Sequence, residues 1–307
     1  MKKTFQMALC LIAAFALASS AFAAPARVAI LGDSITYGGR WATMVESALR
    51  ATPQFANAEI VNFGLSSETV SGLSEPNHAG GKFPRPCLHE RLSRILSDFK
   101  PMLVLACYGM NDGIYLPPDP ARMRAFQDGI LKFKSEVEQQ GGKVIFITAP
   151  LHNADKPSDD PQRYDAVLDA QAAWLNSQRG SGWLVVDIRP DLKSGVTAAK
   201  SVDSGFVYAK DGIHLGEQGH ALIAESVCRQ LWPLLKLTGS PEIAGPDALA
   251  ILSRRSELLK LAWLGKTKHV RPGVPAGFPL GQAEVEAARL LKDYELAAKT
   301  ASASTKK

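Results

Sequence analysis

The chain has 307 residues, of which 46% are hydrophobic and 21% are charged, and its formal net charge at pH 7 is +5. This apolar content is ordinary for a soluble globular protein. The mild positive charge forms no basic stripe with interleaved aromatic residues, so the composition argues against a nucleic-acid-binding protein.

The first 23 residues have the layout of a secretory signal peptide. Lys2 and Lys3 give a basic start, an apolar run extends from Met7 to Ala18, and Ala21-Phe22-Ala23 offers an Ala-x-Ala cleavage site. The run is shorter than the roughly 20 residues that a membrane-spanning helix needs, so we expect cleavage and no stable membrane insertion. The mature protein is therefore expected to be exported, either to the periplasm or to the extracellular medium.

Short apolar runs then alternate with longer helical stretches. The runs are nearly continuous in apolar residues, which is typical of strands buried on both faces of a sheet. This alternation predicts one parallel sheet covered by helices on both sides, with ligands bound beyond the carboxyl ends of the strands. The predicted strands are 27–31, 58–63, 102–107, 143–149 and 183–188, and the predicted helices are 40–50, 88–99, 121–140, 162–179 and 217–237.

A different pattern follows the last of these helices. Residues 238–246 contain Gly and Pro and read as a linker, and helical stretches at 246–263 and 282–298 flank a proline-punctuated segment. The two helices are expected to pack back on the domain or to pair with a second copy as a homodimer. The expected organisation is a signal peptide (1–23), an α/β domain (24–238), a C-terminal helical appendage (239–300) and a disordered tail (301–307).

Polar residues gather where the predicted strands end. Ser34 follows Gly32-Asp33 at the end of the first strand, where a hydroxyl would face the crevice beyond the sheet. Gly64 follows the second strand, where its backbone N–H could point into the same crevice. Each has a simpler interpretation, since serine often caps a helix and glycine often turns the chain.

Two further clusters complete this set. Asn111 follows the third strand and brings a side-chain N–H₂ donor suited to an oxyanion hole, although Asn-Asp-Gly is also a common turn. Asp211 and His214 lie three residues apart just before the last helix of the domain. His214 can act as base for a serine and Asp211 can orient the imidazole, which gives a Ser-His-Asp arrangement in the chain order Ser, Asp, His.

These four clusters resemble the four sequence blocks of the SGNH hydrolase (GDSL-type esterase/lipase) family, in the family's order and at its spacing. The match spans about residues 26–237 and rests on Gly-Asp-Ser at 32–34, Gly64, Gly-Met-Asn-Asp at 109–112 and Asp-Gly-Ile-His at 211–214. The resemblance implies a three-layer α/β/α flavodoxin-like fold. It also implies esterase, lipase, thioesterase or carbohydrate-deacetylase activity that needs neither a metal nor a cofactor.

The resemblance also assigns roles to residues. It implies that Ser34 is the nucleophile, His214 the base and Asp211 the residue that orients it, and that the backbone N–H groups of Ser34 and Gly64 and the side chain of Asn111 form the oxyanion hole. One departure affects the loop after Gly64. Residues 65–69, Leu-Ser-Ser-Glu-Thr, lack the second glycine that the family often has there, which puts the shape of this loop in question.

Candidate substrate contacts are His78, Arg85, Tyr108 and His152, each of which also has a structural interpretation as a loop, ion-pair or packing residue. The stretches 83–92, 106–117 and 263–280 look similar to a branch of the family common in bacteria that degrade polysaccharides. This similarity favours an O-acetyl group on a carbohydrate as the substrate.

The alternatives are a lysophospholipase or thioesterase with the same catalytic groups, or a non-catalytic carbohydrate-binding protein. The last would be marked by loss of Ser34, Asn111 or His214, and all three are present. The cysteines left after processing are Cys87, Cys107 and Cys228, whose spacing fits neither a disulfide framework nor a zinc site. One pair could form a disulfide, and the spacing does not say which.

Overall fold

The computed structural model describes residues 25–156, 160 and 162–304, so the predicted signal peptide and its cleavage site lie outside the described residues. Within that part of the chain, no helix combines the length and the apolar character needed to cross a membrane.

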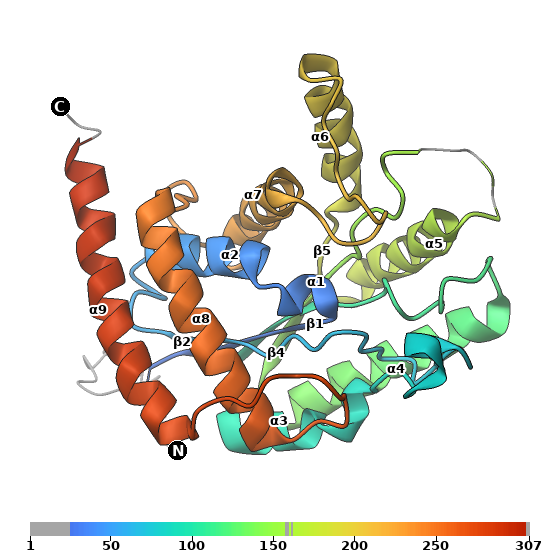
Figure 1. Ribbon diagram of the computed structural model, residues 1–307, viewed down its shortest axis with the longest axis horizontal. Coiled ribbons are helices and arrows are strands. Elements are labelled where there is room, and N and C mark those ends of the chain that lie inside the picture. Colours follow the sequence, from blue (N-terminus) through green and yellow to red (C-terminus); the bar gives the residue numbers. More distant parts are fainter. Residues whose placement is uncertain (1–24, 157–159, 161, 305–307) are drawn as a thin grey trace, which may run out of the picture.

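A five-stranded parallel sheet forms the centre of the molecule, as the sequence predicts (Figure 1). Its spatial order is β2-β1-β3-β4-β5. The chain moves outward from β1 to β2 and then returns to the other side of β1 with β3. The carboxyl ends of β1 and β3 therefore meet at a topological switch point, where open α/β sheets bind ligands. The strands are β1 (Arg27–Gly32), β2 (Glu59–Asn62), β3 (Leu103–Cys107), β4 (Lys143–Ile147) and β5 (Leu184–Val186).

Helices cover both faces of this sheet, which confirms the three-layer α/β/α prediction. One face carries α2 (Arg40–Arg50), α6 (Arg189–Val202) and α7 (Glu217–Leu234), and the other carries α3 (Leu92–Phe99) and α4 (Pro120–Gln139) (Figure 1). Helix α5 (Tyr164–Ser177) packs beside α4. Short elements are α1 (Ser34–Tyr37) and the 3₁₀ helices η1 (His78–Gly81), η2 (Leu88–Glu90) and η3 (Gln178–Ser181).

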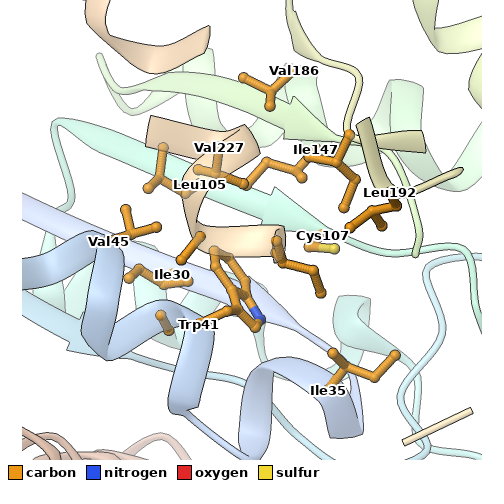
Figure 2. Packing of buried hydrophobic residues seen from close by; sticks show 14 of the residues in the cluster. Ile30, Ile35, Trp41, Val45, Leu105, Cys107, Ile147, Val186, Leu192 and Val227 are labelled. Carbon is orange, nitrogen blue, oxygen red and sulfur yellow. The ribbon is translucent and has the colours of Figure 1, made fainter. Parts of the chain in front are cut away.

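Strand β1 shows why both faces must be covered. Val28 and Ile30 point into one apolar cluster and Ala29 and Leu31 into the other, because successive side chains of a strand point to opposite faces. Figure 2 shows the first cluster, in which the Trp41 ring of α2 packs beneath Ile30. The sheet is therefore buried on both sides at this strand.

Helix α6 is an element that the sequence analysis did not predict. Only Arg189, Leu192 and Val196 of its 14 residues are buried, so it lacks the apolar periodicity that identifies a helix in a sequence. Pro190 lies in its first turn, where a missing N–H costs no helical hydrogen bond.

The C-terminal pair consists of α8 (Pro246–Thr267) and α9 (Leu280–Ser304), which pack on each other. Helix α8 also contacts the α/β unit. The Trp263 ring lies 5.6 Å from that of Phe63 and 5.2 Å from that of Phe99, both centroid to centroid. Arg255 on the same helix forms a buried ion pair with Glu46 of α2, at 2.8 Å. The helices therefore share the core of the α/β unit.

Candidate active site

Ser34 is the first residue of α1 and lies directly beyond the carboxyl end of β1. Asp33 caps this short helix, because its Oδ1 accepts a hydrogen bond from the Ile35 N–H at 2.9 Å. Gly32 makes the turn possible. A Cβ at this position would lie 2.1 Å from Thr36 Oγ1 and 2.6 Å from the Cys107 carbonyl oxygen, so a larger residue does not fit. The backbone thus presents the Ser34 hydroxyl at the switch point of the sheet.

His214 lies between Ser34 and Asp211, although it is 180 residues from Ser34 in the chain. Its Nε2 is 2.9 Å from Ser34 Oγ, and its Nδ1 is 2.7 Å from Asp211 Oδ2. The other carboxylate oxygen of Asp211 accepts the backbone N–H groups of Ile213 and His214, at 2.9 and 2.7 Å. The structure therefore brings together the three residues that the sequence singled out.

The charge state of Asp211 fixes the tautomer of His214. Partial burial alone would raise the pKa of Asp211, but hydrogen bonds from the His214 side chain and from the backbone lower it to about 2. An ionised Asp211 accepts the Nδ1–H of a neutral imidazole. Nε2 is then free to accept the Ser34 O–H, which is the arrangement that a general base requires.

Ser34 and His214 open into a cavity of about 300 Å³. No residue that lines it is acidic, within the part of the chain that the structure describes, and Ile213 is its one aliphatic lining residue. The walls come from the loops after β1, β2 and β3, from the loop before α7 and from the segment between α8 and α9. The lining residues are Ser34, Ser66, Ser67, His78, Arg85, Asn111, Tyr115, Ile213, His214 and Arg271.

Asn111 lines this cavity with an amide whose orientation is fixed. Its Oδ1 accepts hydrogen bonds from Arg85 Nη1 at 2.9 Å and from the Tyr115 hydroxyl at 3.1 Å. Its Nδ2 donates to the Glu68 carbonyl oxygen at 3.2 Å. Because an amide nitrogen carries two N–H groups, one remains for a ligand in the cavity.

Gly64 differs from the sequence-based expectation. Its N–H donates to Asn62 Oδ1 at 2.7 Å, and Gly64 is not among the residues that line the Ser34 cavity. A Cβ on Gly64 would lie 2.4 Å from the Tyr37 nitrogen, so a larger residue does not fit at this position. The glycine lets the loop after β2 approach α1 closely.

On the loop after β2, Ser67 rather than Gly64 lies at the wall of the Ser34 cavity. It lines the cavity, its φ is +68°, and among the described residues no hydrogen bond engages its backbone N–H. The sequence held a signal for this position, namely the glycine that the family often has in this loop and that this chain lacks. A left-handed φ is what glycine adopts most readily, and Ser67 adopts it in its place.

Arg85 and His78 lie on the long loop between β2 and α3, and both line the cavity as candidate substrate contacts should. The Arg85 guanidinium holds Glu75 with two hydrogen bonds, at 2.6 and 2.7 Å, and lies over the Tyr115 ring. His78 Nδ1 is 3.4 Å from Glu75 Oε1. Glu75 thus anchors both residues to the same wall.

The expectation that Tyr108 contacts substrate is wrong. Its side chain is 2% exposed, its hydroxyl donates to Glu68 Oε2 at 2.6 Å, and its ring packs against Phe133. Tyr108 belongs to the apolar cluster under the α3 and α4 layer, on the side of the sheet away from α2 and α7. Its hydrogen bond to Glu68 connects it to the loop after β2. Glu68 also forms a buried ion pair with Arg91, at 2.7 Å.

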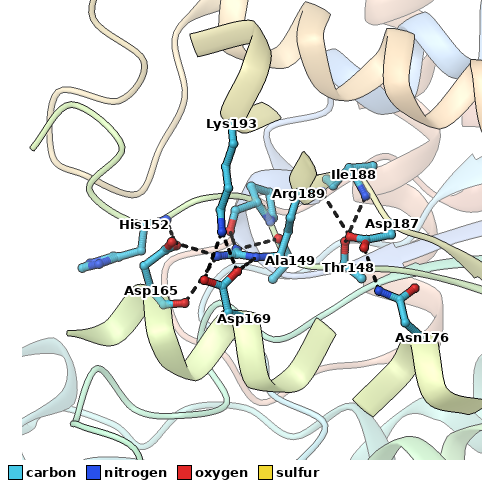
Figure 3. A network of polar contacts seen from close by, with 11 residues as sticks. Thr148, Ala149, His152, Asp165, Asp169, Asn176, Asp187, Ile188, Arg189 and Lys193 are labelled. Atoms are coloured by element: carbon cyan, nitrogen blue, oxygen red, sulfur yellow. Dashed lines mark hydrogen bonds and ion pairs between the residues drawn. The ribbon is translucent and has the colours of Figure 1, made fainter. Parts of the chain in front are cut away.

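His152 lines a neighbouring cavity of about 440 Å³ that contains none of Ser34, Asp211 and His214. The centroid of its ring is 5.8 Å from that of Tyr115, which lines the Ser34 cavity, whereas His152 does not. Figure 3 shows the charged network around it. Arg189 pairs with Asp165 and Asp169, both at 2.8 Å, and Asp165 also accepts the His152 N–H. The structure therefore does not bring His152 into contact with the cavity at Ser34.

Two buried carboxyl groups lie beneath the site. Burial, followed by the nearby charge of Asp112, raises the pKa of Asp33 to about 7. Burial likewise raises the pKa of Asp112 to about 6, although its Oδ1 accepts the N–H groups of Val70 and Ser71, both at 2.8 Å. Asp112 therefore shapes the loop after β2.

Within the described residues, no three His, Cys, Asp or Glu side chains are grouped so as to hold a metal ion. Cys87, Cys107 and Cys228 are all unpaired.

The model of the GDSL-like lipase/acylhydrolase family matches residues 30–222, a range that contains Ser34, Asn111 and His214. No curated protein matches the chain. Among solved structures, two catalytic mutants of Axe2, an acetylxylan esterase from Geobacillus stearothermophilus, are each similar, with a TM-score of 0.50 and 18% identity over 67% of this chain and 94% of theirs. LAE5, an alpha/beta hydrolase from the metagenome of Lake Arreo, Spain, has a TM-score of 0.49 and 21% identity over 68% of this chain and 96% of its own. At 18% identity, the similarity to Axe2 is evidence for the fold alone.

Proposed function

Because the chain belongs to the GDSL-like lipase/acylhydrolase family and is a carboxylic ester hydrolase, we propose that Ser34 is its nucleophile and that hydrolysis proceeds through an acyl-serine intermediate. One observation carries this proposal. His214 is within hydrogen-bond distance of both Ser34 Oγ and Asp211 Oδ2, at 2.9 and 2.7 Å. A serine with a base that a carboxylate orients is the arrangement that activates a hydroxyl for acyl transfer.

The reaction begins when Ser34 Oγ attacks the ester carbonyl carbon and His214 Nε2 takes the hydroxyl proton. The tetrahedral intermediate collapses as His214 returns this proton to the leaving alcohol. A water molecule then attacks the acyl-serine, with His214 again as base, and releases the acid. Asp211 stabilises the imidazolium that forms in both halves of the reaction.

The oxyanion of each tetrahedral intermediate needs donors that face the cavity. We assign this role to the backbone N–H groups of Ser34 and Ser67 and to the second N–H of Asn111 Nδ2. Ser67 is supported by its place in the cavity wall and by the absence of a partner for its amide among the described residues. Asn111 is supported by the contacts that fix its orientation.

The proposed substrate is an O-acetyl group on a carbohydrate. The Ser34 cavity is small, near the lower end of the range of about 300–1,000 Å³ for ligand pockets, and every residue that lines it except Ile213 has a polar or charged side chain. Such a cavity suits a short acyl group and a hydroxyl-rich leaving group. Ile213 is the one aliphatic side chain that it offers to the long acyl chain of a lysophospholipid or fatty thioester, which is the alternative substrate class. Axe2, which has a similar fold, is an acetylxylan esterase, and this supports the same substrate class.

Ser34→Ala tests the nucleophile. We expect purified Ser34→Ala to lose hydrolysis of p-nitrophenyl acetate to the background rate and to keep the wild-type melting temperature. Ser97→Ala, which removes an exposed serine of α3, is the matched control and should retain full turnover. Unchanged turnover in folded Ser34→Ala would contradict the proposal.

The acyl chain is tested with wild-type protein. We expect the acetyl ester to be hydrolysed with a much higher kcat/KM than the decanoyl ester of p-nitrophenol. The opposite preference would favour the lipid alternative.

Export is also proposed, because residues 1–23 have the pattern of a signal peptide. Expression of the full chain in an export-competent bacterium, followed by N-terminal sequencing, should give a mature protein that begins at Ala24. A product that keeps Met1 would contradict this expectation.

A further inference from the structure

One wall of the Ser34 cavity comes from the far end of the chain. Arg271 lies in the segment between α8 and α9, residues 268–279, which joins the neighbouring ends of these helices (Figure 1). Its guanidinium lies 5.6 Å from the centroid of the Phe83 ring, and Phe83 contacts the His78 ring edge-on at 5.3 Å. These contacts place Arg271 against the loop that carries His78 and Arg85.

Arg271 is the one cationic lining residue that has no carboxylate partner among the described residues. The charge of Arg85 is offset by Glu75, which it contacts with two hydrogen bonds at 2.6 and 2.7 Å. Burial, followed by the charge of Arg85, lowers the pKa of His78, which favours the neutral form of this ring. On α8, Glu257 is engaged by Lys260, at 2.6 Å.

The hydrogen-bonding capacity of Arg271 is also unfilled. Its Nη1 donates to the Pro272 carbonyl oxygen at 2.9 Å, and no hydrogen bond engages its Nη2 among the described residues. An anionic group in the cavity would supply an acceptor and would also offset the charge.

We propose that Arg271 binds a carboxylate of the substrate, so that the preferred esters are O-acetylated carbohydrates that contain uronic acid. The inference rests on the proposed esterase function, because it places the acetyl group at Ser34 and the acidic sugar against the segment between α8 and α9. A guanidinium presents a planar set of N–H donors that matches the geometry of a carboxylate. A single unpaired positive charge suits a single carboxylate.

The test compares an acetylated galacturonate oligosaccharide with an acetylated xylo-oligosaccharide and with p-nitrophenyl acetate. We expect Arg271→Gln to lower kcat/KM for the acidic ester by roughly ten- to a hundredfold, mainly through KM. The two neutral esters should change by less than about twofold, which also shows that the variant is folded. Lys268→Gln removes an exposed charge from the same segment, outside the cavity, and should leave all three substrates unchanged.

An equal loss on acidic and neutral esters would overturn the inference, because Arg271 would then only support the cavity wall. An unchanged kcat/KM for the acidic ester would overturn it as well. A calorimetric titration with trigalacturonate gives a readout that does not depend on hydrolysis. Weaker binding to Arg271→Gln than to wild type supports the carboxylate site, and equal binding contradicts it. Failure of the wild type to hydrolyse p-nitrophenyl acetate would instead count against the proposed esterase function.

Discussion

Asn111 is held by groups that themselves have no direct part in the proposed reaction. Arg85 and Tyr115 both donate to its Oδ1, and Glu75 holds Arg85 in turn. Preorganised donors stabilise an oxyanion more than mobile ones do, because they need no reorganisation as the charge develops. The loop between β2 and α3 therefore affects turnover through the orientation of one amide.

We expect Asn111→Ala to lower kcat by roughly a hundredfold or more, because one oxyanion donor is worth about 3–4 kcal/mol in comparable sites. Tyr115→Phe removes one donor to Oδ1 and leaves the Asn111 amide in place, so its effect on kcat should be smaller. Steady-state kinetics with p-nitrophenyl acetate measures both. Near-wild-type kcat in folded Asn111→Ala would show that the amide does not stabilise the oxyanion.

At the scale of elements, α8 serves both the core and the site. Trp263 packs against Phe63 at the end of β2 and against Phe99 of α3. Lys260, one turn earlier, donates from Nζ to the Tyr37 carbonyl oxygen at the end of α1, at 2.6 Å. Helix α8 thus braces the short helix that carries Ser34.

We expect Trp263→Ala to lower the free energy of unfolding by about 3–5 kcal/mol, the usual cost of removing a large buried aromatic side chain. Phe278→Ala is the matched control, because Phe278 follows in the segment between α8 and α9 and is 64% exposed. It should change the stability by less than about 0.5 kcal/mol. Urea denaturation measures both, and equal midpoints for Trp263→Ala and wild type would show that α8 is not part of the core.

The elements also show how far the sequence could predict this protein. The strands were identifiable because they are buried on both faces and therefore continuously apolar, whereas α6 has too few buried residues to show a period. Tyr108 was misassigned because an aromatic residue at a strand end looks the same in sequence whether it faces the crevice or the core. Its partner Glu68 comes from another loop, and only the fold brings the two together.

The candidate site was predictable to the extent that its residues follow strands. Ser34 and Asn111 come together because the strands that they follow end at one edge of the sheet, and His214 reaches them on the loop before α7. The sequence could not show whether the amide of Gly64 or that of Ser67 faces the cavity, because this depends on the φ angles of the loop. Arg271 was not predictable, since it reaches the cavity only through the packing of two helices that follow the α/β unit.

At the scale of the whole molecule, buried carboxyl groups connect the site to global stability. The pKa of Asp33 rises from 3.8 to about 7, so between these pH values the group is neutral in the folded protein and ionised in the unfolded chain. The unfolded chain therefore releases a proton that the folded protein retains. The stability that the neutral carboxyl contributes is fully present below about pH 4 and is lost as the pH rises through about 7.

We expect the melting temperature of the wild type to fall more between pH 4 and pH 8 than that of Asp33→Asn. Asparagine keeps an acceptor for the Ile35 N–H and carries no charge at any pH in this range. The shift in pKa corresponds to a few kcal/mol, which should be measurable by calorimetry as a difference of several degrees. Parallel curves for the two proteins would contradict the assignment.

The contacts of α8 have a consequence for the order in which the protein assembles. Lys260 meets Tyr37 across 223 residues, and Arg255 meets Glu46 across 209. Closing loops of this length is entropically costly and slows folding. Helix α8 also contacts β2, which lies at one edge of the sheet. During synthesis, β2 therefore lacks this cover until nearly the whole chain has left the ribosome. The wall that carries Arg271 is added last, so a nascent chain that already holds Ser34, Asn111 and His214 still lacks the residue proposed to select its substrate.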